Sequence, residues 1–115
     1  MLIRVAIASR DGKFIHQHFG HAESFLVFEI DGDRYTCIDV RVNKPACHQH
    51  EHDDDAMARS IDLIHDCQAV LASRIGPGAQ ARLIEHGIHP FEIADFIDHA
   101  LQRLVSSGYL QTFLA

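Results

Sequence analysis

The stretch AVLASRIGPGAQARLIEHGIHPFEI, residues 69–93, decides the fold of this chain. Its first four residues, 69–72, are small or β-branched and apolar, as is typical of a short buried strand. A Gly-Pro-Gly turn at 76–78 then leads into a helix predicted over about 79–86, which the next residue, a glycine, ends. A last strand is predicted over 88–93, where a proline favours an edge position. Strand, helix and strand in this order indicate a parallel α/β unit.

The residues before this unit predict three strands and one helix. Strands are expected over 3–8, 24–30 and 35–42, and the Asp-Gly-Asp turn at 31–33 makes the last two antiparallel. In the third strand the even positions are expected to form one apolar face, and the odd positions to point the other way. A helix is predicted over 55–66 because its apolar residues recur at helical spacing.

A final helix is predicted after the last strand and ends near Gly108, with an apolar stripe of Ile97, Leu101, Leu104 and Val105. The complete order is therefore βββαβαβα. It predicts one α/β domain over residues 1–115, with three α/β/α layers around a five-stranded mixed sheet.

Composition and charge narrow the classes of partner. The chain has 115 residues and a formal net charge of −6, which opposes the electrostatic attraction that drives nucleic-acid binding. Its apolar runs are far shorter than the roughly 20 residues of a membrane span. We therefore expect a cytoplasmic protein with neither a nucleic-acid nor a membrane partner.

Histidine is the unusual feature of the composition. There are ten, and six of them lie in two short polar stretches, together with one of the three cysteines. The residues concerned are His16, His18 and His21, and then Cys47, His48, His50 and His52. Imidazole and thiolate are ligands that suit zinc, copper, nickel, iron and iron–sulfur clusters. The alternative interpretation is that these are solvated loop residues whose imidazoles bond the backbone or bind metal without purpose.

The topology predicts that the two histidine stretches meet. The loops 9–23 and 43–54 leave the same edge of the sheet if the second strand lies between the first and third, and the turn 73–78 opens at that edge too. Arg10, Lys13 and Arg74 would stand around the same crevice. The amides of Gly76 and Gly78, at the start of a helix, could hold an anion there, although a two-glycine turn is more often only a tight turn.

The other two cysteines have a structural interpretation. Cys37 lies on a predicted strand and Cys67 just before one, positions where cysteine usually acts as a small buried apolar residue.

Six short segments together resemble one known family. These segments are Val5 to Ser9, Gln17 to Ala22, Phe25 to Glu29, Cys67-x-Ala69-Val70-Leu71, Ile75-Gly76 and Gly87-Ile88. In that order they are similar to the dinitrogenase iron-molybdenum cofactor biosynthesis family of nitrogen fixation, which includes NifX, NafY and the C-terminal domain of NifB.

The resemblance implies a fold, a cargo and two leading ligands. It implies a ribonuclease H-like α/β/α fold and a protein that binds, carries or protects iron-molybdenum cofactor or its iron–sulfur precursor without catalysing a reaction. His18 would occupy the family's most recognisable histidine position, and Cys47 the cysteine that NifB-like members carry after the third strand. Those members continue with a glycine-rich stretch, whereas this chain continues with three histidines.

Three functions follow as hypotheses. The first is a metallocluster carrier in which His18 and Cys47 ligate and the other loop histidines assist, working with an unidentified assembly or recipient protein. The second is a buffer or sensor of zinc, nickel or copper ions that uses the 47–52 loop and holds a mononuclear metal. The third is a metal-dependent hydrolase, which needs several converging carboxylates. On the predicted strands only Glu29, Asp39 and Glu92 are available for that chemistry.

Overall fold

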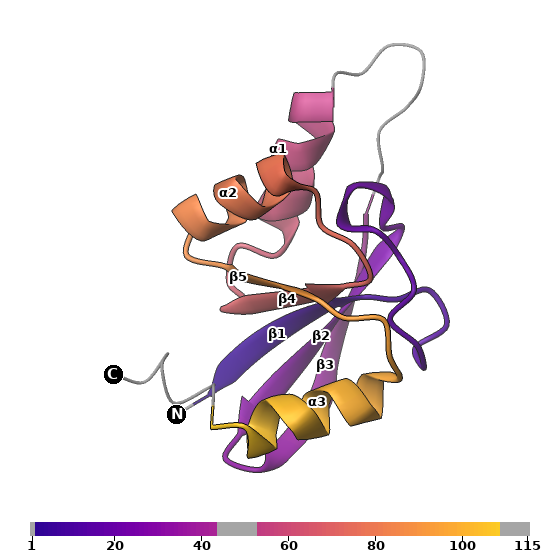
Figure 1. Cartoon of the computed structure of the whole chain (residues 1–115), viewed down its shortest axis with the longest axis vertical. Helices are drawn as coiled ribbons and strands as arrows, with labels where there is room; N and C mark the ends of the chain where they lie inside the picture. The colour runs from indigo at the N-terminus through magenta and orange to yellow at the C-terminus, as the bar shows by residue number, and fades with distance from the viewer. Residues whose placement is uncertain (1, 44–52, 109–115) are drawn as a thin grey trace.

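The computed structural model describes residues 2–43 and 53–108 of the chain, and the backbone but not the side chains of residues 53–55. Five strands and three α-helices alternate in the predicted order (Figure 1). The elements are β1 (Ile3–Ala8), a 3₁₀ turn η1 (Phe19–His21), β2 (Ser24–Asp31), β3 (Arg34–Val42), α1 (Asp53–Leu63), β4 (Ala69–Ala72), α2 (Pro77–Glu85), β5 (His89–Glu92) and α3 (Ile97–Ser106).

The five strands form one mixed sheet in the order β3-β2-β1-β4-β5. β2 pairs antiparallel with β1 on one side and with β3 on the other. β4 pairs parallel with β1, and β5 pairs parallel with β4. The predicted five-stranded mixed sheet is therefore confirmed, with β2 between β1 and β3 as the loop argument required.

Two apolar cores lie on opposite faces of the sheet. α1 and α2 cover one face and α3 covers the other (Figure 1). On β1 the side chains alternate strictly: Ala6 and Ala8 join the core under α1 and α2, whereas Val5 and Ile7 join the core under α3. This alternation separates the molecule into the three predicted layers.

Helix boundaries differ from the prediction by about a turn. α2 begins at Pro77 rather than near Ala79. Proline suits the first helical position because its φ is already helical, and because the N–H that it lacks would have no partner within the helix. α1 spans Asp53–Leu63 rather than 55–66, so it begins directly after the histidine-rich segment. No helix among the described residues is long and apolar enough to cross a membrane.

The predicted faces of β3 are wrong over half of its length. A β-bulge interrupts the pairing, so that Val27 opposes Asp39 while Phe28 opposes Cys37. The extra residue shifts the alternation, and the odd positions before the bulge share a face with the even positions after it. β3 is also an edge strand, so Val40 and Val42 are 58% and 80% exposed instead of buried.

The two cysteines among the described residues differ in burial, because only Cys37 lies on the edge strand. Cys67 is buried, and burial, helped by the negative charge of Asp66, raises the pKa of its thiol to about 12. It stays protonated and acts as the small apolar residue that was predicted. Cys37 is exposed on the edge strand, so the buried position predicted for it is wrong.

An ionic cluster joins three elements at the end of α1 remote from the histidine-rich segment. The Asp66 carboxylate accepts hydrogen bonds from Arg4 Nη1 on β1, at 2.8 Å, and from Arg41 Nη2 on β3, at 2.9 Å. Arg41 Nη1 also donates to the Leu63 carbonyl at 2.9 Å. These bonds hold the pKa of Asp66 well below its usual range, because the two guanidinium groups stabilise the ionised form.

Candidate functional site

His18 lies beside Arg74 although 56 positions separate them, because the chain before η1 runs parallel to the extension of β4. The two residues form an isolated parallel bridge. Phe19 N donates to the Arg74 carbonyl at 2.9 Å, and Ser73 N donates to the Gln17 carbonyl at 3.0 Å. These backbone bonds fix the place of His18 independently of its side chain, which is exposed.

The turn η1 brings His21 back toward His18. His21 N donates to the His18 carbonyl at 3.1 Å, and the two imidazole centroids are 6.4 Å apart. Phe19, between them, is fully buried against Phe25 in the core under α1 and α2. The buried phenyl ring anchors the turn, so its two neighbouring histidines are presented outward from a fixed base.

A cavity of about 460 Å³ opens at this turn, and we call it the histidine cavity. Its loop and α2 residues are His18, Gly20, His21, Arg74, Gly76, Gly78 and Ala79, and its α1 residues are Ala56, Met57 and Ser60. Five residues singled out from the sequence thus line one space: His18, His21, Arg74, Gly76 and Gly78. The predicted convergence of the 9–23 loop and the 73–78 turn is confirmed for these residues.

The start of α2 places free backbone amides at the wall of the cavity. Gly76 is the N-cap and no side chain caps the helix, so first-turn amides such as that of Gly78 lack an intrahelical acceptor. A Cβ added at Gly20, Gly76 or Gly78 would meet no atom within 4 Å, and none of the three has a positive φ. Neither packing nor backbone strain therefore requires glycine here, and its effect is to leave the cavity open.

A carboxylate on the neighbouring strand β5 holds the 73–78 turn in place. Glu92, on β5, accepts a hydrogen bond from Ile75 N at 3.1 Å. Gln80 Nε2 donates to the Ile75 carbonyl at 3.0 Å and to the other Glu92 carboxylate oxygen at 3.3 Å. The position of Arg74 at the rim is thus set by β5 and α2 together.

Three residues predicted for the crevice do not line the histidine cavity, and one of them, Lys13, lines a different cavity on the opposite face of the sheet. His16 Nδ1 lies 2.9 Å from the Phe14 carbonyl, and the ring is engaged with its own loop. Arg10 Nε lies 3.5 Å from the Glu23 carboxylate, with 71% of the arginine side chain exposed. Both are near in sequence to His18 but occupy other parts of the loop.

Cys47, His48, His50 and His52 lie outside the described residues. The described residues on either side of them belong to the cavity region. On one side Asn43 is buried, and its Nδ2 donates to the Ala22 carbonyl at 2.8 Å and to Ser60 Oγ at 3.0 Å. On the other side α1 begins at Asp53, and its residues Ala56 and Met57 line the cavity.

Among the described side chains, those of residues 2–43 and 56–108, no group of three or more from His, Cys, Asp and Glu is arranged to hold a metal ion. The carboxylates considered for hydrolysis are engaged separately. Glu29 pairs with Arg4 at 3.6 Å, Asp39 with Arg41 at 3.0 Å, and Glu92 holds the 73–78 turn. The convergence of carboxylates that a two-metal hydrolase needs is absent from this part of the chain.

Sequence reasoning missed Met57 and Asn43. Met57 lies in the helix predicted over 55–66, where apolar residues are expected to pack on the sheet. Its half-buried side chain also lines the cavity with a thioether, a soft ligand type. Asn43 was assigned to a polar loop, yet it ties the end of β3 to α1. The only sequence signal for either was proximity to the histidine-rich segment.

Comparison with protein families gives a match over residues 1–107 to the family described as dinitrogenase iron-molybdenum cofactor. The chain is 36% identical over 106 residues to the FeMo cofactor biosynthesis protein NifB of Frankia alni, covering 90% of this chain and 21% of that protein. It is 32% identical to NifX of Azotobacter vinelandii, covering 82% of this chain and 58% of NifX. It is 39% identical to NifY of Klebsiella pneumoniae, covering 76% of this chain and 36% of NifY.

Solved structures share the fold. The crystal structure of the protein PH0822 superposes with a TM-score of 0.71 at 20% identity, covering 91% of each chain. A Thermotoga protein solved by NMR and described as a candidate NifB protein gives a TM-score of 0.61 at 21% identity, covering 92% of this chain and 89% of that one. The chain spans about a fifth of the length of the NifB relative, so these likenesses concern one domain of that longer protein.

Proposed function

Because this chain belongs to the dinitrogenase iron-molybdenum cofactor family, we propose that it binds and carries an iron-molybdenum or iron–sulfur type metallocluster, or a precursor of one, without catalysing a reaction. Its relative NifB is named as a FeMo cofactor biosynthesis protein, which supports this proposal. The carrier would work in the cytoplasm, a reducing compartment in which the free thiols of Cys37 and Cys67 persist.

One observation carries the proposal: His18 and Arg74 are held side by side at the mouth of the histidine cavity. Imidazole is a suitable ligand for iron and other transition metals, and a guanidinium group offsets the negative charge of a metal–sulfur cluster. The first turn of α2 also lies at the cavity, and the positive end of the helix dipole there favours an anion. Arg74 is the charged group among the described lining residues, and its positive charge suits an anionic cluster better than a bare divalent cation.

The remaining ligands would come from the histidine-rich segment. We assign Cys47 as the thiolate ligand, and His21, His48, His50 and His52 as assisting ligands. Of the described residues that flank that segment, Asn43 bonds Ser60, which lines the cavity, and Ala56 and Met57 at the start of α1 line it directly. Few ligands at an open rim suit a carrier, because a closed cage of four ligands would release its cargo slowly.

The test is anaerobic loading followed by gel filtration, with the retained chromophore and the metal content measured together. The protein is incubated with isolated iron-molybdenum cofactor or with an iron–sulfur cluster. We expect wild type to retain the chromophore and the double variant His18→Ala, Cys47→Ala to lose it, because both proposed ligands are removed.

Two matched variants separate ligation from general damage. His16→Ala removes an imidazole two residues from His18 that does not line the cavity, and Cys37→Ala removes an exposed thiol on β3. Both should retain the cluster as wild type does. Retention by the double variant, or equal loss from the matched variants, would contradict the proposal.

Calorimetry with zinc, nickel and copper ions distinguishes the alternative of a metal-ion buffer or sensor. Tight stoichiometric binding of a bare ion that is abolished by replacing His48, His50 and His52, and indifferent to His18→Ala, would favour the buffer. The carrier proposal predicts instead that His18 matters and that bare ions bind weakly.

A further inference from the structure

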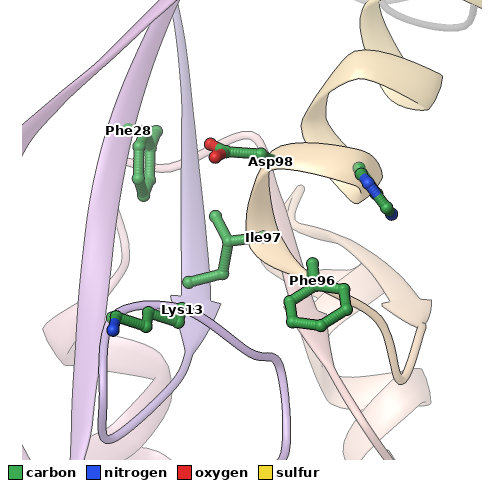
Figure 2. Close-up of a pocket in the computed structure, with 7 residues that line it drawn as sticks. Lys13, Phe28, Phe96, Ile97 and Asp98 are labelled. Atoms are coloured by element: carbon green, nitrogen blue, oxygen red, sulfur yellow. The ribbon is translucent and has the colours of Figure 1, made fainter.

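A second cavity, of about 520 Å³, lies on the sheet face opposite the histidine cavity, and we call it the α3 cavity. It is formed between the loop after β1, strand β2 and the first turn of α3. Phe28, Ile97 and Phe96 supply apolar walls, and Lys13 and Asp98 lie at opposite ends of the group in the close-up (Figure 2). An apolar cavity with charges of opposite sign at its two ends fits a ligand with an apolar centre and two charged flanks.

The loop that carries Lys13 is held rigidly against α3. The Asp11 carboxylate accepts hydrogen bonds from Lys13 N at 2.9 Å and from Phe14 N at 3.0 Å. Ile97 N donates to the Lys13 carbonyl at 2.8 Å, and the Phe14 and Phe96 rings meet edge to face with centroids 5.2 Å apart. The Lys13 side chain itself is exposed and has no ion pair within the described part of the chain, so its ammonium group is available to an anion.

The apolar surface extends beyond the cavity along β3. Val40 pairs with Leu26, which lies on the same face of β2 as Phe28. Val40 and Val42 are 58% and 80% exposed, and Phe96 is 53% exposed at the cavity. Exposed apolar side chains at the cavity and along the neighbouring edge strand are the kind of surface at which a protein partner docks.

We propose that this face docks an extended segment of a partner protein, in which an apolar side chain is flanked at alternate positions by an acidic and a basic residue. In an extended segment, alternate side chains share one face, so all three can meet the surface together. The apolar side chain enters the α3 cavity against Phe28 and Ile97, the acidic group meets Lys13, and the basic group meets Asp98.

The two charges set the direction of the bound segment, because reversing it would place like charges together. The inference rests on the proposed function in one respect: a carrier must meet a protein that supplies or receives its cargo. The docking face and the histidine cavity lie on opposite faces of the sheet, so a docked partner would leave the cargo opening free.

The experiment is an NMR titration of the metal-free full chain with the peptides acetyl-Glu-Ser-Phe-Ser-Lys-amide and acetyl-Lys-Ser-Phe-Ser-Glu-amide. We expect saturable binding of one of them, with amide shifts concentrated at Lys13, Ile97, Asp98 and His99. Lys13→Glu should weaken this binding by about fivefold or more, since close charge pairs across an interface contribute strongly. Replacing the peptide's glutamate by lysine should restore binding to Lys13→Glu.

Arg10→Glu is the matched control, because Arg10 is an exposed cation of the same loop that pairs with Glu23 outside the α3 cavity. Its effect on peptide binding should stay below about twofold. The proposal is overturned if neither peptide saturates at a concentration on the order of a few mM, or if the Lys13 and Arg10 variants behave alike.

Two other occupants are outcomes of the same test and would also overturn the proposal. Binding of 3-phenylpropionate as tight as that of the peptide would assign the cavity to a small molecule. A dimer in sedimentation that Val42→Lys abolishes would assign the face to a second copy of the chain. Because the titration uses metal-free protein, its failure leaves the cluster-loading result unaffected, and each hypothesis fails on its own.

Discussion

The two ends of α1 differ in whether the charged and polar side chains around them are paired. Beyond its C-terminal end, the Asp66 carboxylate is bonded by Arg4 and Arg41, and Arg41 also binds the Leu63 carbonyl. Near its N-terminal end, His18 and Arg74 are exposed at the histidine cavity. Neither side chain there has an ion pair within the described residues.

The difference separates an end whose charges support the fold from an end whose side chains we propose as ligands. The Asp66 cluster joins β1, β3 and the α1–β4 connection, so its charges are committed to one another. At the histidine cavity the backbone is fixed by hydrogen bonds, while the side chains keep their bonding capacity for something else. A fixed backbone that presents unpaired side chains suits the carrier proposed above, because those side chains can bind a cargo without first giving up other partners.

The largest expected effect is on stability and concerns the C-terminal end. Asp66→Asn should lower the free energy of unfolding by about 2–3 kcal/mol, because hydrogen bonds to charged groups are among the stronger ones and Arg4 and Arg41 lose the carboxylate that they share. Urea denaturation followed by circular dichroism measures this. Cluster retention in the folded variant should equal that of wild type.

Asp62→Asn is the control for this change, since Asp62 is an exposed carboxylate in the last turn of α1 and lies four residues before Asp66. It should alter stability by a few tenths of a kcal/mol at most, as surface substitutions usually do. If both variants lost equal stability, or if Asp66→Asn lost the cluster, the two ends of α1 would not have the separate roles proposed here.

The second prediction concerns acid. The arginines hold the pKa of Asp66 below that of an unfolded aspartate, which is about 3.9. The stability that this carboxylate contributes is therefore fully present above about pH 4 and is lost as the pH falls through its folded pKa. Urea titrations from pH 7 to pH 3 should show the gap between wild type and Asp66→Asn narrowing only below about pH 4. A constant gap over that range would contradict the assignment.

The smallest effect concerns the cavity end. Arg74→Gln should weaken cluster retention by about fivefold, equivalent to about 1 kcal/mol for an exposed charge facing an anion. The paired control is Arg10→Gln, because that arginine lies on the neighbouring loop but does not line the cavity. Equilibrium dialysis of the loaded protein at two salt concentrations gives both affinities. The difference between the variants should shrink as the salt concentration rises.

Local patterns were enough to predict the elements and their order. The strand, helix and strand of residues 69–93 carry their own signals in β-branched residues, a Pro-Gly helix start and a glycine stop. The faces of β3 were not predictable in the same way, because a bulge is a property of the pairing between two strands. The same applies to the exposure of Cys37, which follows from β3 being an edge strand.

The site was predictable in part. The topology predicted that the 9–23 loop and the 73–78 turn leave the same edge, and His18, His21 and Arg74 do line one cavity. Residue type and spacing do not separate His18 from His16, because both lie in one polar stretch, and it is the family resemblance that singles out His18. The structure adds the physical distinction: His18 bridges to Arg74, whereas the His16 ring lies against the Phe14 carbonyl.

The sequence by itself determined which chemistry the chain can offer: imidazoles and a thiol in polar loops, two arginines and a glycine-flanked helix start. It also determined the α/β layers, because alternation and helical spacing are local properties that fix which side of each element is apolar. The tertiary structure alone decided which of those groups meet, since contacts between residues 56 positions apart depend on how strands pair and not on their neighbours in the chain. It likewise decided that Met57 faces the cavity and that Lys13 and Asp98 enclose a second one on the opposite face of the sheet.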